Sequence, residues 1–373
     1  MTLDRGCDTQ DRRVPLVIEV SVCSDHGVRD PVIEETSRHG LSAKAVAEIC
    51  ELKSAIWREL APSDPLMTKD AALSELLSAP AQTTEQLVVA KVAGKVVGIG
   101  MSHRPTRSAN ANLLTVTVEV HPSNRRVGLG RLLLASLVSA GRDAGCDSIL
   151  GWGPRTEATN NFWDGFGVPE VQRSSRSRAI IATIDADLMA SWEAASAARS
   201  AGYHLRSFVG ACPDRYMDLY TTAQNGMQDA PSDGLDQSYE PLDDVGVRSY
   251  EARLAERGGT GHVILAIDSA GNAAGLTEVA TFDHTPRVVF QQTTAILPVH
   301  RRQGLGRWLK AEMYRHILGQ LSDADVIETG NADSNGPMLA VNAGMGFAPF
   351  LSYTIRQGDL AGVAQRLEPS RHR

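Results

Sequence analysis

The chain has 373 residues, of which 42% are hydrophobic and 22% are charged. These values are typical of globular proteins and exclude a mostly disordered or fibrous chain, and the length favours two domains over one. Acidic residues outnumber basic residues by 44 to 37, which gives a net charge of −7. This balance disfavours a protein that binds nucleic acid through a broad basic face.

The sequence shows no run of about 18 apolar residues, so we expect no membrane span. Residues 1–16 are charged and lack the apolar core of a secretory signal. The five cysteines are odd in number and dispersed, without a CxxC pair or a Cys/His cluster. This pattern predicts a reduced, cytoplasmic protein without a metal site.

Strands and helices alternate along the first half of the sequence. Helix ends are predicted from the N-cap residue Ser42 and from Gly145, which follows a helical segment. The predicted elements are a strand at 14–22, a helix at 42–60, a hairpin at 87–101 turning at Ala93-Gly94, a strand at 113–120, a helix at 129–144, a strand at 148–152, a short helix at 159–166, a strand at 179–184 and an Ala-rich helix at 186–200.

The second half gives the same order of elements. The acidic, polar segment 228–245 is expected to be a surface loop, and residues 1–13 and 368–373 are expected to fray. The predicted elements are a strand at 203–212, a helix at 214–227, a helix at 247–257, a hairpin at 263–282 turning near Gly271, a strand at 288–296, a helix at 305–318, a strand at 326–328, a short helix at 337–344 and a strand at 349–357.

The two halves are a repeat, because matching residues recur at nearly one offset. Arg125 and Arg301 are 176 positions apart, and each is followed by a strand-to-helix loop of the form Arg-Arg-x-Gly-x-Gly. Gly167 and Gly346 are 179 positions apart. We therefore expect two copies of one fold, an N-terminal domain at 14–192 and a C-terminal domain at 202–367, joined by a helical linker at 193–201.

The glycines of each loop allow a tight turn and a close approach of backbone to a ligand. The helix that begins there directs unpaired N–H groups and a positive dipole end outward, which suits a pyrophosphate. The two arginines before each loop are expected to add positive charge. A Walker A loop needs Gly-Lys-Ser/Thr, and a Rossmann loop needs a third glycine; both are absent from these two segments.

The remaining pattern, Arg/Gln-x-x-Gly-x-Gly/Ala after a strand, resembles the acyl-CoA loop of the GNAT N-acyltransferase superfamily, and it occurs twice. The resemblance implies an α/β fold of two tandem GNAT domains, each a mixed, mostly antiparallel twisted sheet with flanking helices and a splayed parallel strand pair. It implies acetyl-CoA as co-substrate, possibly one molecule per domain, with the pantetheine between the splayed strands. An N–H group near Val120 or Ile296 is expected to polarise the thioester carbonyl.

The resemblance also assigns the residues expected to contact the cofactor. In the first copy they are Val120, Arg125, Arg126, Val127, Gly128, Leu129, Gly130 and Arg131; in the second they are Ile296, Arg301, Arg302, Gln303, Gly304, Leu305, Gly306, Arg307, Asn331 and Asn335. Asn335 is alternatively a helix cap.

The two copies differ in their candidate acids and bases. Many GNAT enzymes have a tyrosine acid at the positions of Trp163 and Asn342, and no tyrosine precedes Tyr203. Glu278 is the candidate general base, and its counterpart in the first copy is Met101. Glu328 and Glu119 are further carboxylates near the expected site. Each of these glutamates, and Glu278 as well, is alternatively a solvated strand residue, and for Glu119 this is the favoured interpretation.

These observations and the resemblance predict an acetyl-CoA-dependent N-acetyltransferase. In it a small amine attacks the thioester directly, and the chemistry takes place in the C-terminal domain. The architecture resembles that of bacterial tandem-GNAT proteins, including mycothiol synthase. Two alternatives stay open: an acyl-CoA-binding protein without catalysis, and a protein-lysine acetyltransferase. The sequence leaves the oligomeric state undetermined.

Overall fold

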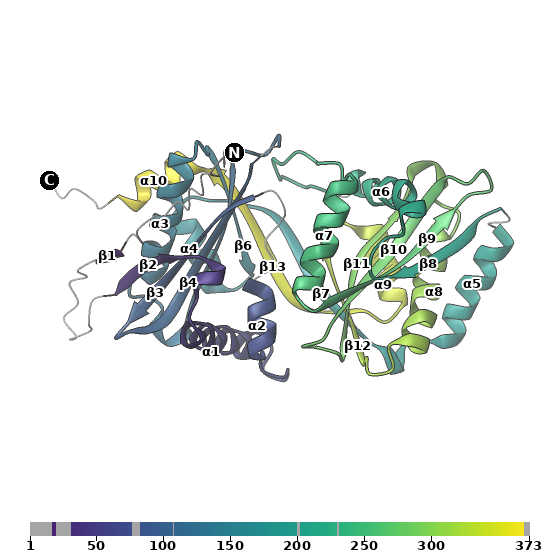
Figure 1. Ribbon diagram of the computed structural model, residues 1–373, viewed down its shortest axis with the longest axis horizontal. Helices are drawn as coiled ribbons and strands as arrows, with labels where there is room; N and C mark the ends of the chain where they lie inside the picture. The colour runs from purple at the N-terminus through teal and green to yellow at the C-terminus, as the bar shows by residue number, and fades with distance from the viewer. Residues whose placement is uncertain are drawn as a thin grey trace, which may run out of the picture.

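The computed structural model describes residues 17–19, 31–76, 83–106, 108–199, 202–229 and 231–368. In these ranges both repeats contribute to one sheet of thirteen strands (Figure 1). The strands are β1 (Val17–Glu19), β2 (Val32–Thr36), β3 (Thr83–Val92), β4 (Lys95–Pro105), β5 (Leu113–Val120), β6 (Ser148–Pro154), β7 (Glu170–Ile180), β8 (His204–Val209), β9 (Gly259–Ile267), β10 (Ala273–Phe282), β11 (Val288–Ile296), β12 (Val326–Ala332) and β13 (Ala348–Asp359).

The order of strands shows that the two repeats exchange their last strands. Across the sheet the order is β1-β2-β3-β4-β5-β6-β13-β7-β12-β11-β10-β9-β8. The C-terminal strand β13 therefore pairs with β6 of the first repeat, and β7 of the first repeat pairs with β12 of the second. Two pairs, β5–β6 and β11–β12, are parallel, and the others are antiparallel.

Helices cover both faces of the sheet. The α-helices in the described residues are α1 (Ala43–Leu60), α2 (Lys69–Leu76), α3 (Leu129–Asp143), α4 (Glu157–Gly165), α5 (Ala186–Arg199), α6 (Met217–Asn225), α7 (Asp244–Glu256), α8 (Leu305–Gln320), α9 (Gly336–Gly344) and α10 (Leu360–Leu367). We call β1–β6, α1–α4, β13 and α10 the N-lobe. We call β8–β12, α6–α9, β7 and α5 the C-lobe.

Most of the predicted elements are confirmed, with shifts of a few residues at their ends. The Ser42 side chain accepts a hydrogen bond from the Ala45 N–H and so caps α1. Ala93 and Gly94 both have positive φ at the predicted hairpin turn. Leu133 of α3 and Leu309 of α8 occupy equivalent positions of the two repeats, and both are fully buried, so the two helices bury the same face.

The predicted end of the first repeat differs from the structure. The predicted strand at 179–184 is instead the end of β7, which begins at Glu170, followed by a 3₁₀ turn at Ile181–Thr183. The helix that follows, α5, is not a bare linker. Its residues Met189 and Trp192 are buried in the core shared with α8, so α5 packs on the C-lobe.

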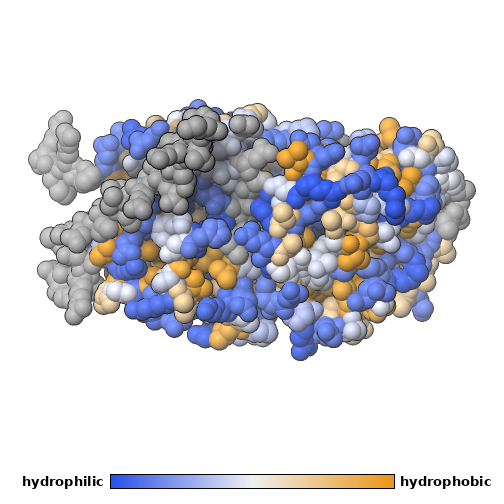
Figure 2. Space-filling view, in the orientation of Figure 1, coloured by the Kyte–Doolittle hydropathy of each residue, from blue (hydrophilic) through white to orange (hydrophobic). Residues whose placement is uncertain are grey.

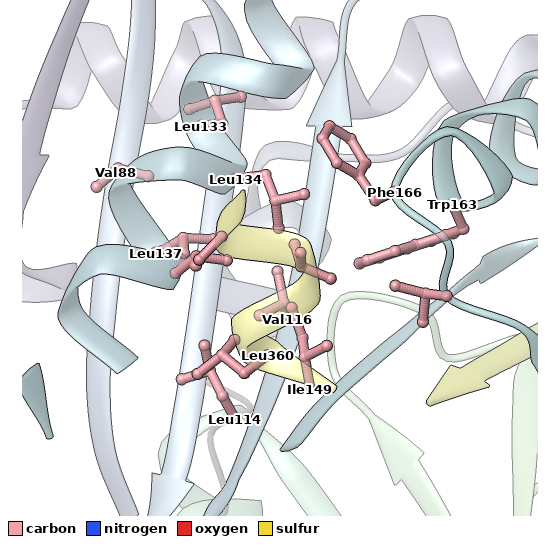
Figure 3. Close-up of a cluster of buried hydrophobic side chains, with 14 of the residues drawn as sticks. Val88, Leu114, Val116, Leu133, Leu134, Leu137, Ile149, Trp163, Phe166 and Leu360 are labelled. Atoms are coloured by element: carbon pink, nitrogen blue, oxygen red, sulfur yellow. The ribbon is translucent and has the colours of Figure 1, made fainter. Parts of the chain in front are cut away.

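The C-terminal helix α10 is the counterpart of α5 and was not predicted. It packs against α3 in the N-lobe, across the molecule from α8 and α9 of its own repeat (Figure 1). Leu360 is fully buried and lies among Leu114, Val116 and Ile149 (Figure 3). Each repeat thus supplies a strand and a helix that complete the core of the other lobe.

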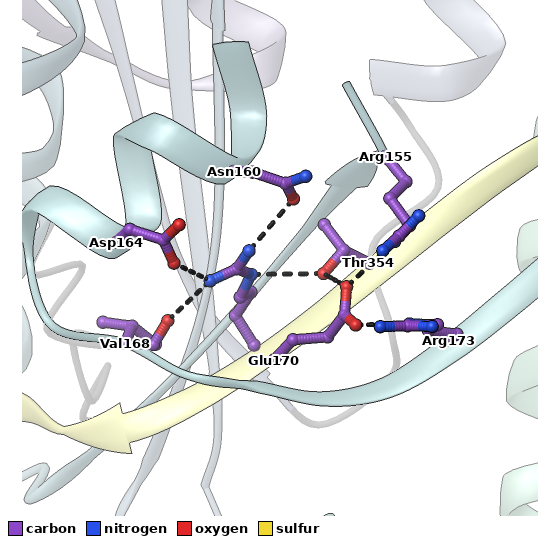
Figure 4. Close-up of polar contacts among 8 residues, drawn as sticks. Arg155, Asn160, Asp164, Val168, Glu170, Arg173 and Thr354 are labelled. Carbon is purple, nitrogen blue, oxygen red and sulfur yellow. Dashed lines mark hydrogen bonds and ion pairs between the residues drawn. The ribbon is translucent and has the colours of Figure 1, made fainter. Parts of the chain in front are cut away.

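A buried arginine fixes the exchanged strand β13 in the N-lobe. Arg356 is 5% exposed and donates hydrogen bonds to Asp164, Asn160, the Val168 carbonyl and Thr354 (Figure 4). The Thr354 hydroxyl in turn donates to Glu170. The partners of Arg356 outside β13 all belong to the first repeat, so the network ties the C-terminal strand to the N-lobe.

The surface is mixed in character. Figure 2 shows hydrophilic and hydrophobic residues interspersed over both lobes. Val127 and Val299, beside the two glycine loops, are among the exposed large apolar residues. No helix in the described part of the chain has the length and apolar character needed to cross a membrane.

Candidate active site

Both glycine loops have the backbone shape that the sequence predicts. Gly128 and Gly304 are the N-caps of α3 and α8, with φ of 88° and 86°. Arg126 and Arg302, two residues earlier, also have positive φ, of 68° and 64°. An ideal Cβ on Gly128 meets no heavy atom within 4 Å, so the first loop has open space beside this glycine.

The N-termini of α3 and α8 differ from most other helix starts in the described chain. Neither has a hydrogen bond from a capping side chain, because its N-cap is glycine. Five other helices have a side-chain cap, supplied by Ser42, Thr156, Asp243, Asn335 and Asp359. The loop helices therefore present backbone N–H groups that suit an anionic ligand.

The first arginine of each loop has a structural contact in addition to its charge. The Nε of Arg125 donates to the Val120 carbonyl at 3.1 Å, and the Nε of Arg301 donates to the Ile296 carbonyl at 3.0 Å. Each arginine thus closes its loop onto the end of the preceding strand. Arg125 also forms an ion pair with Glu59, which offsets its positive charge.

The other predicted loop residues have different surroundings in the two lobes. Leu129 and Leu305 are buried core residues. Arg131 donates to the carbonyls of Arg366 and Glu368 at the end of α10. Arg307 instead lies over the Trp192 ring, and Gln303 accepts a hydrogen bond from the Tyr203 hydroxyl.

The two parallel strand pairs separate as the resemblance implies. The pairing of β5 with β6 ends at Val116 and Gly151, and the pairing of β11 with β12 ends at Phe290 and Glu328. We call these places the first fork and the second fork.

Large aromatic side chains fill the first fork. An ideal Cβ on Gly151 would lie 2.0 Å from the Trp163 ring, so the buried indole sits directly on the last paired residue of β6. Phe162 lies against the loop itself, 3.0 Å from an ideal Cβ on Gly130. At the equivalent Gly306 the nearest atom, from Ile296, is 3.8 Å away. The Trp163 indole therefore covers one face of the first fork and Phe162 lies against its loop, whereas Gly306 of the second loop has no aromatic neighbour within 4 Å.

A polar pair replaces the aromatic rings beside the second fork. Asn342, at the position of Trp163, is 3% exposed, and its Nδ2 donates to Asn331 Oδ1 at 2.8 Å. Its Oδ1 is buried and has no hydrogen-bond partner among the described residues. A buried carbonyl without a partner is costly, and a ligand N–H in the fork offers it one. Asn335 caps α9 by accepting from the Met338 N–H, as its alternative interpretation expected.

The strand beside the second fork contains a bulge that the first lobe lacks. The register between β10 and β11 shifts between Thr277 and Val279, so that two residues of β11 oppose Glu278. The equivalent ladder between β4 and β5 runs from Gly98 to His103 without a shift. Bulges of this kind redirect side chains and backbone groups, and here the bulge lies opposite the candidate base.

Glu278 is a buried carboxylate and not a solvated strand residue. It is 2% exposed and accepts hydrogen bonds from the Tyr220 hydroxyl at 2.8 Å, the Tyr250 hydroxyl at 2.9 Å and the Gln224 amide at 2.7 Å. Burial raises the pKa of Glu278, and the three donors oppose that rise by stabilising its charged form. Burial also raises the pKa of Tyr220 and Tyr250, with the neighbouring carboxylate adding to the effect.

The sequence did not identify the three partners of Glu278. Tyr220 and Gln224 lie one helical turn apart on α6 and so share a face, which is a detectable signal only once Glu278 is known to lie beneath them. Tyr250 comes from α7. Tyr250 and Gln224 are partly buried, whereas Tyr220 is buried.

The other two candidate carboxylates are held by cations. Glu328 forms ion pairs with Arg176 and Arg178 of the exchanged strand β7. Glu119 pairs with Lys53, which is 6% exposed. Both carboxylates are therefore held in ion pairs, whereas Glu278 has no cationic partner among the described residues.

Comparison with known proteins agrees with this architecture. Residues 47–167 match the acetyltransferase (GNAT) family. A solved tandem GNAT protein from the clavulanic acid biosynthesis pathway aligns with 88% of this chain and 98% of its own, with a TM-score of 0.71 and 21% identity. A GCN5-related N-acetyltransferase from Sphaerobacter thermophilus aligns with 88% of this chain and 96% of its own, with a TM-score of 0.61 and 12% identity.

No curated protein sequence matches this one significantly. The structural similarities, at these identities, establish the fold. Residues 47–167 thus match the GNAT acetyltransferase family, and the chain as a whole has the fold of the tandem GNAT proteins.

Proposed function

We propose that the protein is an N-acyltransferase that transfers the acetyl group of acetyl-CoA to a small amine, with one catalytic site, in the C-lobe. The observation that carries the proposal is Glu278, a buried carboxylate without a cationic partner on the strand next to the second fork. The N-lobe has Met101 at this position and an apolar ring in its fork.

The residues of the second loop and fork fit acetyl-CoA. Gly304 and the N-terminus of α8 suit the pyrophosphate, since a glycine with positive φ and the backbone N–H groups of a helix start meet there. The unpartnered Oδ1 of Asn342 suits an amide N–H of the pantetheine. The bound thioester supplies the activated acetyl group, and β11 supplies the backbone beside which its carbonyl lies.

Glu278 accepts the proton that the amine must lose. Because the carboxylate is 2% exposed, the proton reaches it through the Tyr250 hydroxyl, which receives the amine proton as it gives its own to Glu278. A raised pKa brings a carboxyl group closer to neutral pH and makes it a better base for this transfer.

The second candidate function is acyl-CoA binding without turnover. One observation favours it: Asn342 stands where many GNAT enzymes have a tyrosine acid, and an amide cannot protonate a leaving thiolate. The two functions differ in one measurable quantity, the release of free thiol in the presence of an amine.

A matched pair of variants tests the proposal. Gly304→Glu and Gly128→Glu impose similar backbone strain, because both positions have nearly equal positive φ. We expect Gly304→Glu to weaken acetyl-CoA binding by roughly 100-fold, since a carboxylate there repels the pyrophosphate, and to abolish thiol release. We expect Gly128→Glu to leave both unchanged.

Native mass spectrometry of acetyl-CoA titrations measures the binding, and thiol release over a panel of small amines measures turnover. One bound molecule per wild-type chain agrees with a single site. Two bound molecules, or equal losses in the two variants, would contradict the assignment to the C-lobe. Binding without thiol release for any amine or lysine peptide would favour the second candidate function.

A further inference from the structure

Lys310 of α8 is a buried cation that the proposed function leaves without a role. The chain has six lysines, and Lys310 is the only one that follows Lys95. It is 2% exposed, and its ammonium group lies 5.7 Å from the centre of the Phe347 ring. Within the described residues Lys310 has no carboxylate partner. Burying an ammonium group without an anion is costly, so its presence indicates a role other than stability.

The equivalent position in the first repeat is an ordinary core residue. Leu134 precedes Lys310 by 176 positions, which is the offset of the two glycine loops. It is fully buried, in one cluster with the Phe166 and Trp163 rings (Figure 3). The fold therefore accepts an apolar side chain at this point of the helix, and the lysine is a specific feature of the C-lobe.

The side of the second fork that faces α8 is polar, whereas the same side of the first fork is apolar. Val289 and Ile327, in the paired part of β11 and β12, belong to the core shared with α8. Gln291 and Thr329 lie two residues further along these strands and so point to the same side. The buried set on this side is Lys310, Gln291, Thr329 and Asn342, and its counterparts in the N-lobe are Leu134, Val116, Gly151 and Trp163. Lys310 is the only titratable residue in this set.

The chemistry of Lys310 suits a proton donor. Burial lowers the pKa of its ammonium group to about 7. The carboxylates of the surrounding elements have partners of their own: Glu328 of β12 pairs with two arginines, Glu312 of α8 and Glu193 of α5 pair with Arg315, and Glu278 of β10 accepts from neutral groups. An ammonium group whose pKa is close to the working pH transfers its proton readily, as a general acid must.

We propose that Lys310 is the general acid of the C-lobe site. When the amine nitrogen bonds to the carbonyl carbon and the C–S bond breaks, the electron pair of that bond goes to sulfur, and the Lys310 ammonium group donates its proton there. The products are an amide and the CoA thiol, and the neutral Lys310 amine then takes a proton from water. Lys310 thus supplies the proton that the amide of Asn342 cannot. This inference rests on the proposed function, because it assumes that the thioester lies in the second fork.

Lys310→Met tests this role, with Leu134→Met as the matched control. Both variants place methionine at the equivalent buried position of a loop helix, and methionine adapts to such positions with little strain. With the best amine from a panel of spermidine, glucosamine and tobramycin, we expect Lys310→Met to lower kcat roughly 100-fold, with acetyl-CoA affinity within about twofold of wild type. The basic limb of the pH profile of kcat, which reports loss of the Lys310 proton, should disappear. Leu134→Met should change neither kcat nor the profile.

A second measurement locates the ammonium group without relying on turnover. In the full chain with isotope-labelled lysine, the NMR signal that is missing from Lys310→Met belongs to Lys310, and its dependence on pH gives the pKa of that residue. CoA and desulfo-CoA differ only in the sulfur atom. We expect the pKa of Lys310 to be higher with CoA bound than with desulfo-CoA bound, because only CoA brings a thiolate with which the ammonium group can pair.

The outcomes separate this inference from the proposed function. Thiol release that persists unchanged in Lys310→Met, or equal pKa values of Lys310 with CoA and with desulfo-CoA, would overturn the inference and leave the proposed function intact. An acetyl group found on Lys310 after incubation with acetyl-CoA would also overturn it, since an acetylated lysine donates no proton to a thiolate. A wild-type chain that binds acetyl-CoA but releases no thiol with any of these amines would overturn both.

Discussion

At the scale of single residues, the site is defined by how each carboxylate is satisfied. Glu119 and Glu328 have cationic partners, whereas Glu278 has only neutral donors. Neutral hydroxyl and amide donors stabilise the charge of a buried carboxylate less than a cation does. The pKa of such a carboxyl group therefore stays higher than that of a carboxyl group in an ion pair. This is the arrangement expected of a base and not of a structural ion pair.

The pH profile of kcat/KM tests this assignment. Glu278 must be deprotonated to act, so activity should rise with pH through its raised pKa. Tyr250→Phe removes one donor from the carboxylate, raises that pKa further and should move the acid limb to higher pH, with a lower maximum because the relay is lost. Glu278→Gln should abolish the limb and lower kcat/KM by roughly 10²- to 10⁴-fold. An acid limb that persists in Glu278→Gln assigns the base elsewhere.

The residues of this site were predictable to different degrees. Glu278 could be proposed from the sequence because its counterpart in the first repeat is the apolar Met101. Tyr220 and Tyr250 are not, because only the packing of α6 and α7 on the sheet brings them to Glu278. The ion pairs of Glu328 were likewise hidden, since its partners Arg176 and Arg178 come from the other repeat.

At the scale of elements, a histidine pair between β9 and α8 makes stability depend on pH. His262 Nδ1 lies 3.0 Å from His316 Nε2. Burial and then His316 lower the pKa of His262 to about 4, and burial lowers that of His316, although Glu312 opposes this. The unfolded chain takes up these protons near pH 6.5 and the folded chain does not, so stability should fall as the pH drops from about 6.5 towards 4.

Thermal unfolding at several pH values measures this effect. Between pH 7 and pH 5, above the range where most carboxylates titrate, we expect the Tm of wild type to fall more than that of the His262→Gln/His316→Gln variant. The comparison is between the two slopes of Tm against pH, so that a difference in Tm at pH 7 does not enter it. Equal slopes would show that the pair does not govern the acid sensitivity.

Elements with a clear apolar period were predicted well, and those without one were not. The strand β5 reads as alternating β-branched residues and was predicted with its observed limits. In contrast, β7 has the sequence EVQRSSRSRAI, in which polar and charged side chains predominate. Its arginines make ion pairs with β12 and with Asp64, so tertiary contacts and not local preference determine that it is a strand.

At the scale of the whole molecule, the exchange of the closing strands could not be predicted from the sequence. The closing strands of the two repeats are equivalent, so a repeat pattern is satisfied whether each returns to its own sheet or crosses to the other. The crossing is decided by contacts such as those of Arg356 with Asp164 and Asn160. Its consequence is that neither lobe has a complete core without a segment from the other repeat.

This architecture predicts that the lobes unfold together. Arg356→Ala removes a 5%-exposed side chain that bonds β13 to α4 and leaves the carbonyl of the buried Val168 without this donor, so we expect a loss of about 2–4 kcal/mol in the free energy of unfolding. Arg173→Ala is the matched control, because Arg173 joins the same network through Glu170 but its side chain is 55% exposed; its loss should cost under about 1 kcal/mol.

Hydrogen exchange then locates the damage. β13 and α10 complete the N-lobe, whereas the chain before them builds the C-lobe. Loosening β13 in Arg356→Ala should therefore reduce protection from hydrogen exchange in both α3 and α8, within one cooperative unfolding transition. Two separate transitions, with α8 as well protected as in wild type, would mean that each lobe keeps its stability without the exchanged strand.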